Sequence, residues 1–211
     1  GDKTPSLGGG GGGGKTTISV SAISVEGVAK VGETLTAKVT PDKATVNYQW
    51  MRSDSENEGY APIEGATEKT YKLVAADVGK YIKVRATGTG DYRGTVESEP
   101  MGPVVETATF KPVDSYGIHD GKVYAGYELQ DENGAQIPLV ESNIESMSVK
   151  DPDGNVTDLT VVGNEDPLLW FNIAKEAGTY TYEVKTKAGK VYTATLNWDK
   201  EINTTATWEP T

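Results

Sequence analysis

Apolar side chains recur at every second position in short runs along this chain, and this alternation restricts it to β-structure. The stretch "ETLTAKVT", for example, places Leu35, Ala37 and Val39 on one face of an extended segment. Comparable runs return about every 10 to 15 residues, separated by Gly, Asp, Asn and Pro, as in antiparallel sandwiches. Helical periodicity is limited to about one turn each in "KLVAADVGK" and "PLLWFNIAKEAG", where glycine ends the pattern. The sequence therefore predicts an all-β protein.

The runs fall into two blocks, which predicts two tandem antiparallel β-sandwiches of the immunoglobulin-like type. The first block holds about seven strands in about 90 residues, the number and size typical of such a domain. A connector with Pro100, Pro103 and Pro112 follows, and the second block contains two hairpins, "SMSVKDPDGNVTDLTVV" and "TYTYEVKTKAGKVYTATLNW". We expect a flexible Gly-rich linker over residues 1–16, one domain over 17–105 and a second over 106–211.

Three residues are expected to have structural roles in these sandwiches. Trp50 is the predicted central packing residue of the third strand of the first block. "DVGKY" and "EAGTY" share an acid-x-Gly-x-Tyr pattern ahead of a long strand, where sandwiches of this class place a tyrosine whose hydroxyl bonds back to the chain. Tyr180 alternates in phase with core residues, as such a corner requires, whereas Tyr81 is out of phase and is expected to lie outward or at a bulge.

The glycine run at residues 8–14 satisfies the phosphate-loop pattern, with Gly14, Lys15 and Thr16 in its last three places. A phosphate loop needs a buried strand before it and a helix directly after it. Here the preceding segment is short and polar, and "TTISVSAISVEG" after it is rich in β-branched residues at period two. The run is therefore interpreted as a tether rather than a nucleotide site.

Composition excludes several classes of function. The chain has no cysteine and a single histidine, His119, so thiol chemistry, Cys-ligated zinc and multi-histidine metal sites are unavailable. No apolar run approaches the length of a membrane span. Residues 15–105 carry a net charge of −1, and residues 106–211 carry −10, which disfavours nucleic acid as a partner.

The first block resembles the tandem immunoglobulin-like repeats of bacterial cell-surface and surface-layer proteins, especially those of Gram-positive organisms. The matching pieces are Tyr48-Gln49-Trp50, Ile63-Glu64-Gly65-Ala66-Thr67, Tyr71, and Asp77-Val78-Gly79-Lys80 before Ile82 and Val84. The resemblance covers about residues 18 to 104. It implies an extracellular array module, secreted or associated with the cell wall, that has no catalytic residues. The second block is similar to such domains only in a general way.

Exposed aromatic rings are candidates for a carbohydrate site, because rings stack on sugar faces. The candidates are Trp170, Trp198, Trp208, Tyr116 and Tyr124. Strand position favours Trp170 and Trp198 as core residues of the second block. Tyr124 alternates out of phase with the inward residues of its strand, and Trp208 lies in the C-terminal tail.

Acidic pairs in the second block are candidates for a structural calcium site, since Ca²⁺ prefers oxygen-rich loops. The residues are Asp151, Asp153, Glu165 and Asp166. The stretch "DPDGN" lacks the spacing and closing glutamate of a calcium hand, and Asp-Gly is common in plain turns. No other cofactor is expected.

The expected function is a non-enzymatic structural or adhesive module of a bacterial cell-surface protein, which presents or spaces a binding surface. Its expected partners are other cell-surface or extracellular proteins, or glycans. The alternative is a carbohydrate-binding module attached to a larger secreted enzyme or adhesin. Carboxylates are numerous, but no spacing selects a catalytic pair, so catalysis is not expected.

Overall fold

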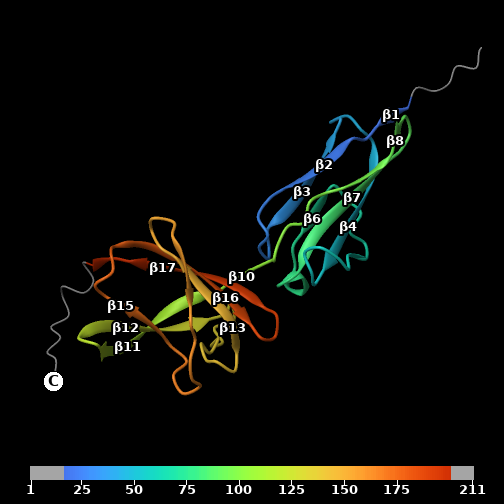
Figure 1. The fold of residues 1–211 in the computed structure, drawn as a ribbon. Coiled ribbons are helices and arrows are strands. Elements are labelled where there is room, and N and C mark those ends of the chain that lie inside the picture. Colours follow the sequence, from blue (N-terminus) through green and yellow to red (C-terminus); the bar gives the residue numbers. More distant parts are fainter. Residues whose placement is uncertain (1–16, 201–211) are drawn as a thin grey trace, which may run out of the picture.

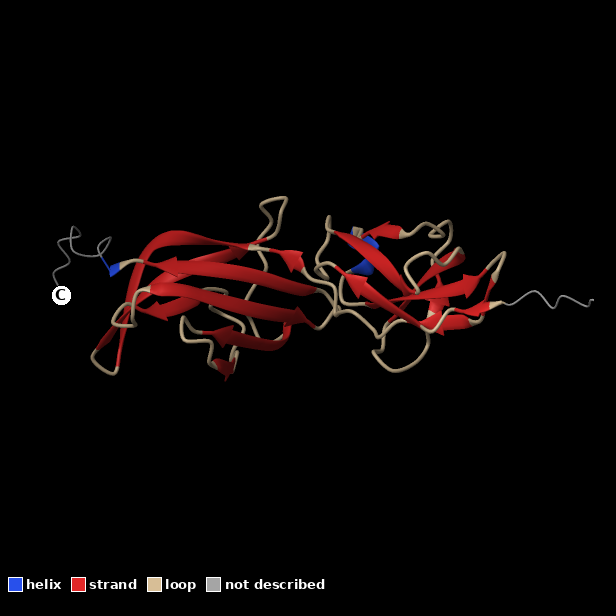
Figure 2. Ribbon diagram, turned by 90° about the horizontal axis from the view of Figure 1, so that it is seen from above, coloured by secondary structure: helices blue, strands red, loops and turns tan. Residues whose placement is uncertain are grey.

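The computed structural model describes residues 17–200 of the chain, and these residues form two β-sandwiches in sequence (Figure 1). The Gly-rich segment with Gly14, Lys15 and Thr16, and the tail with Trp208, lie outside the described residues. Strands dominate the ribbon, and the helical segments are short (Figure 2). No helix between residues 17 and 200 has the length and apolar character needed to cross a membrane. The predicted all-β fold with antiparallel sandwiches is confirmed.

The N-terminal sandwich, residues 17–105, packs a three-stranded sheet against a four-stranded one. The strands of the first sheet, in spatial order, are β2 (Ala22–Glu26), β3 (Thr34–Thr40) and β6 (Thr70–Lys72). Those of the second are β5 (Ala61–Pro62), β4 (Val46–Ser53), β7 (Tyr81–Gly88) and β9 (Thr95–Glu97). In addition, β1 (Ile18–Ser19) pairs in parallel with β8 (Tyr92–Arg93). A 3₁₀ turn, η1 (Ala75–Asp77), precedes β7.

The core of the N-terminal sandwich follows the alternation in the sequence. Its buried apolar residues are Val20, Leu35, Ala37, Val39, Trp50, Leu73, Ile82, Val84, Ala86 and Val104. Val20 and Ile23, three positions apart, both pack in this core, and between them the chain leaves its pairing with β8 and begins to pair with β3. A strand that changes partner in this way accounts for the one-residue slip.

The C-terminal sandwich, residues 106–200, packs a three-stranded sheet against a five-stranded one. The first contains β11 (Thr109–His119), β12 (Lys122–Gln130) and β15 (Leu169–Asn172). The second contains β10 (Glu106–Thr107), β17 (Val191–Trp198), β16 (Gly178–Thr186), β13 (Ile144–Lys150) and β14 (Val156–Leu159). Both predicted hairpins are present, as β13–β14 and β16–β17.

Aromatic rings make up much of the C-terminal core. Phe171 packs against Tyr180 and Trp198 with ring centroids 5.0 Å apart in each pair, and Phe110 lies 5.0 Å from Tyr182. The edge-to-face pairs Phe171–Tyr180 and Phe110–Tyr182 add about 0.5–1.5 kcal/mol each beyond the burial of area. Trp198 is a core residue, as predicted.

The expectation that Trp170 also fills this core is wrong. Leu169 packs against the core and Phe171 lies in it, so Trp170, between them on β15, is on the opposite face of the strand. Side chains alternate across a strand, and only one parity of "LWFN" can face inward.

Candidate functional site

The two sandwiches are connected without an unpaired residue between them. Val105 N–H donates to Ala29 O, and Val31 N–H donates to Val105 O, both at 3.0 Å. The next residue, Glu106, is already the first of β10 and lies opposite Tyr192 of β17. Backbone pairing therefore passes from one sandwich to the other between Val105 and Glu106. The link enters the C-terminal sandwich at β10 (Figure 1).

The segment before this link is paired along its length with the N-terminal sandwich. Met101 and Ile82 exchange two backbone hydrogen bonds of 2.8 Å. Val104, fully buried, donates to Lys80 O and accepts from Gly79 N–H. The part of the predicted connector with Pro100 and Pro103 is therefore held in the first sandwich, while Pro112 belongs to β11 of the second.

A second contact brings the backbones of the two sandwiches together. Gly79 has a φ of +78°, and a Cβ added there would lie 2.1 Å from Gly189 O, at the turn between β16 and β17. Only glycine avoids both the backbone strain and the collision at this position. A crevice of about 320 Å³ lies beside the contact, lined by Asp54, Ser55, Tyr81 and Pro103 on one side and by Glu183 and Lys185, among others, on the other.

The turn that carries Gly79 is fixed by a buried carboxylate, Asp77, which is 0% exposed. Its Oδ2 accepts hydrogen bonds from Tyr71 Oη at 2.7 Å and from Val74 N–H at 2.9 Å, and its Oδ1 accepts one from Arg52 at 3.1 Å. Burial, and next the bond to Asp77, raise the pKa of Tyr71, which keeps the phenol a donor. The acid-x-Gly-x-Tyr pattern of "DVGKY" pointed to its tyrosine, and the role of its aspartate was not predicted. Its role could have been inferred from its position, because an acidic side chain three residues after Val74 has the spacing of a residue that caps a helical turn.

The structural residues singled out from the sequence lie as follows. Trp50 is 0% exposed, stacks on Tyr71 with centroids 5.7 Å apart, and donates from Nε1 to Glu68 O at 2.8 Å. Tyr180 Oη donates to Glu176 O at 2.7 Å, the bond that a tyrosine corner makes. Tyr81 is half-buried and lines the crevice at the joint.

In the C-terminal sandwich the entering and leaving strands pair in parallel. β10 opens this sandwich and pairs in parallel with β17, which closes the described part of it. In the N-terminal sandwich the entering strand β1 pairs in parallel with β8, and Val105, at the leaving end, forms a separate parallel bridge with Lys30. Because β10 and β17 point the same way, tension on the two ends of the C-terminal sandwich slides them past each other and loads their hydrogen bonds together.

Of the candidate sugar-binding residues, Tyr124 and Trp170 come together on the outer face of the sheet β11–β12–β15. Tyr124 lies opposite Gly117, and Trp170 lies opposite Gly126. Gly117, Tyr124 and Trp170 line a depression of about 320 Å³ together with Ile118 and His119. We call this surface the aromatic ledge. Tyr116, 40% exposed, lies opposite Ala125 and so has the parity of the other face of the sheet.

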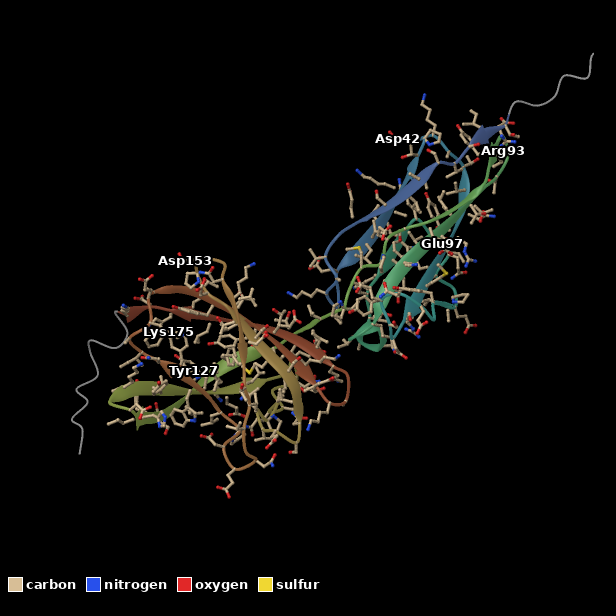
Figure 3. The ribbon with its side chains drawn as sticks, viewed as in Figure 1. Asp42, Arg93, Glu97, Tyr127, Asp153 and Lys175 are labelled. Carbon is tan, nitrogen blue, oxygen red and sulfur yellow. The ribbon has the colours of Figure 1, made fainter. Side chains whose placement is uncertain are left out.

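The acidic pairs lie in two separate loops. Asp151 Oδ1 accepts from the backbone N–H groups of Asp153 and Asn155 in the turn of the β13–β14 hairpin, where Asp153 lies at the outer tip (Figure 3). Asp166, next to Glu165, accepts from Leu168 N–H and from Trp170 Nε1. Between residues 17 and 200, no three Asp, Glu, His or Cys side chains are grouped in a way that could hold a metal ion. Calcium binding by these residues stays a prediction.

Comparisons with known proteins give little further information. No family model and no curated protein sequence matches this chain. One similar solved structure is described as a tetra-tandem repeat in the extending region of a large adhesion protein, with 16% identity over 85% of this chain and a TM-score of 0.24. Another concerns host cell-surface retention of a 1.5-MDa bacterial ice-binding adhesin, with 13% identity over 85% of this chain and a TM-score of 0.25. This chain spans only part of those two chains, 49% and 64% of their lengths.

Proposed function

We propose that this chain is a non-enzymatic structural module of a bacterial cell-surface protein, secreted or associated with the cell wall. In this proposal, residues 17–105 and 106–200 are two immunoglobulin-like domains that act together as a stiff spacer. They hold an adhesive or binding surface away from the cell, toward other surface proteins, extracellular proteins or glycans. The resemblance of the first block to tandem surface repeats supports the setting, and the geometry of the joint supports the role.

The observation that carries the proposal is that Val105 is still paired with the N-terminal sandwich, while the next residue, Glu106, is already paired with the C-terminal one. Domains linked by a flexible segment move relative to each other unless an interface restrains them. Here the last pairing of one domain and the first pairing of the next are on adjacent residues, and Gly79 and Gly189 are in backbone contact. The parallel pairing of β10 and β17, the entering and leaving strands of the C-terminal sandwich, supports a role under tension.

Small-angle X-ray scattering on the full chain and on two insertion variants tests the stiffness of the joint. A short Gly-Ser insertion between Val105 and Glu106 separates the two pairings and is expected to broaden the distribution of interdomain distances. The same insertion after Gly154, in the β13–β14 turn, is the matched control and is expected to leave that distribution unchanged. A wild-type chain that scatters like the joint variant would refute the stiff spacer.

The alternative expectation, a carbohydrate-binding module, has one observation in its favour, the aromatic ledge. A sugar site on the ledge is compatible with the spacer, since the ledge lies on the sheet β11–β12–β15 and the contacts at the joint involve β10, β16 and β17. A spacer and a ligand site can therefore reside in the same chain.

A further inference from the structure

In the aromatic ledge, large aromatic side chains lie beside glycines of the neighbouring strands on the outer face of one sheet. On this face β11 contributes Gly117, β12 contributes Tyr124 and Gly126, and β15 contributes Trp170. A Cβ added at Gly126 would lie 3.1 Å from Trp170 Cζ3, and one added at Gly117 would lie 3.5 Å from the same atom. The indole ring therefore extends from β15 over both glycines, and any larger side chain at Gly126 would displace it.

The ring of Trp170 is held in place rather than loosely exposed. Its Nε1 donates to Asp166 Oδ2 at 2.5 Å, and Asp166 in turn accepts from Leu168 N–H at 3.1 Å. Phe171, the next residue, is anchored in the core against Tyr180 and Trp198. A large aromatic side chain that is fixed before a ligand arrives loses little conformational entropy on binding.

The shape and chemistry of the ledge favour a single flat, uncharged ring. The depression is about 320 Å³, and its aromatic lining comes from Tyr124 and Trp170. A hydrogen-bonding group, His119 at the end of β11, lines it, and Asn172 lies opposite Tyr124 on the same outer face of the sheet. Few polar groups around an apolar, concave surface are typical of small-ligand sites.

The charge of this part of the chain disfavours anionic ligands. Residues 106–211 carry a net charge of −10, so a phosphate- or uronate-bearing ligand would approach against the field of the domain. A pyranose has an apolar C–H face that stacks on aromatic rings and hydroxyl groups that bond to a polar border. A neutral sugar therefore fits both the rings and the charge.

We infer that the aromatic ledge binds a neutral sugar ring of a glycan, with Trp170 and Tyr124 as stacking platforms and His119 as a hydrogen-bonding group at the border. Gly117 forms the floor, and Gly126 leaves the space in which the indole lies. This inference does not depend on the stiffness of the joint, so either can fail without the other.

Two-dimensional ¹H–¹⁵N NMR of the full chain tests the inference, because each indole N–H gives its own signal. The probes are neutral oligosaccharides of glucose, mannose, galactose and N-acetylglucosamine, with oligogalacturonate as the anionic counterpart. We expect at least one neutral oligosaccharide to shift the Trp170 indole signal and the Gly117 and Gly126 amide signals saturably. The Trp50 indole signal, from the other domain's core, should not move.

Two variants locate the site while leaving the core intact. Trp170→Ala removes the platform, and Gly117→Val fills the floor at a strand position where an added Cβ meets the indole at ordinary contact distance. Each should weaken binding at least tenfold, whereas Val156→Thr, an exposed substitution on β14, should leave it unchanged. Retained amide signals of the core strands show that the variants are folded.

Three results would overturn the inference. The first is the absence of a saturable shift at Trp170 with every neutral oligosaccharide. The second is binding that Trp170→Ala and Gly117→Val leave unchanged, or binding of oligogalacturonate alone. The third is a shift of the same signals with protein concentration in the absence of sugar, which would identify the ledge as a contact between two copies of the chain.

Discussion

The two sandwiches carry the same acid-x-Gly-x-Tyr pattern ahead of a long strand and use it in different ways. In the C-terminal sandwich the tyrosine is the bonding residue, since Tyr180 Oη reaches back to Glu176 O. In the N-terminal sandwich the acid is the bonding residue, since Asp77 is buried and binds Tyr71, Val74 and Arg52. The pattern indicates a turn, but the neighbouring strand decides which group is buried, because only the N-terminal sandwich places an arginine, Arg52, beside the acid.

The two sandwiches also differ in where they place a tryptophan. Trp50 is the largest fully buried side chain of the N-terminal core, while Trp170 of the C-terminal sandwich lies on an outer face. One position is governed by packing and the other is available for binding. Substitutions at matched positions can therefore separate stability from function.

Trp50→Ala is expected to have the largest effect, a loss of about 3–5 kcal/mol in the free energy of unfolding of the N-terminal sandwich. Domains are stable by only about 5–15 kcal/mol, so this loss removes a large part of the stability of the sandwich. Trp170→Ala is the matched control and should change the unfolding of the C-terminal sandwich far less. Chemical denaturation followed by NMR, which reports each sandwich separately, checks both. Equal losses would contradict the assignment of Trp170 to an outer face.

Asp77→Ala is expected to cost about 3 kcal/mol, because it leaves the Tyr71 hydroxyl, the Val74 N–H and the Arg52 guanidinium without their acceptor. Glu176→Ala, at the equivalent place in the other sandwich, should stay within about 0.5 kcal/mol, since Tyr180 uses the backbone carbonyl and not the side chain. Thermal unfolding of the two variants gives the comparison. Similar losses in both would show that the two motifs work in the same way after all.

Tyr180→Phe is expected to cost about 1 kcal/mol, the usual net value of one hydrogen bond. The ring keeps its contact with Phe171, so only the bond to Glu176 O is lost. Tyr81→Phe should cost less, because Tyr81 is half-buried at the crevice. A larger loss at Tyr81 than at Tyr180, measured by denaturant unfolding, would contradict this ranking.

Glu106 and its acidic neighbours give the C-terminal sandwich a pH dependence. Burial, and next a hydrogen bond shared with the Glu132 carboxyl, raise the pKa of Glu106, while Lys190 lowers it. The folded state therefore holds its proton to a higher pH than the unfolded state, and this group makes the free energy of unfolding fall as pH rises from the ordinary glutamate pKa to the raised one. Glu106→Gln should flatten that part of the melting-temperature profile. A profile identical to wild type would contradict the assignment.

Much of the fold could be predicted from the sequence because alternation reports directly on burial. Leu35, Ala37 and Val39 face the core as expected, and Pro-Asp-Gly at residues 152–154 marks a hairpin turn. The relation of the two sandwiches could not be predicted, since the contact of Gly79 with Gly189 joins residues far apart in the chain.

The candidate site was only partly predictable for a related reason. Tyr124 was identified by its parity. Trp170 was assigned to the core because its run, "PLLWFNI", is apolar at almost every position. Such a run does not show which of its residues face the core. The glycines on which the indole lies belong to neighbouring strands, so only the register of the sheet could reveal them.

The central claim, that the two sandwiches form a spacer able to bear tension, is tested most directly by pulling single molecules apart. With force applied through the ends of the chain, the parallel pair β10–β17 is sheared and its hydrogen bonds are loaded together. In the C-terminal sandwich, force applied across the turn of the β13–β14 hairpin and the end of β17 instead peels bonds one at a time. The account predicts clearly higher unfolding forces through the chain ends than across the hairpin, at the same loading rate. Equal forces in the two directions would contradict it.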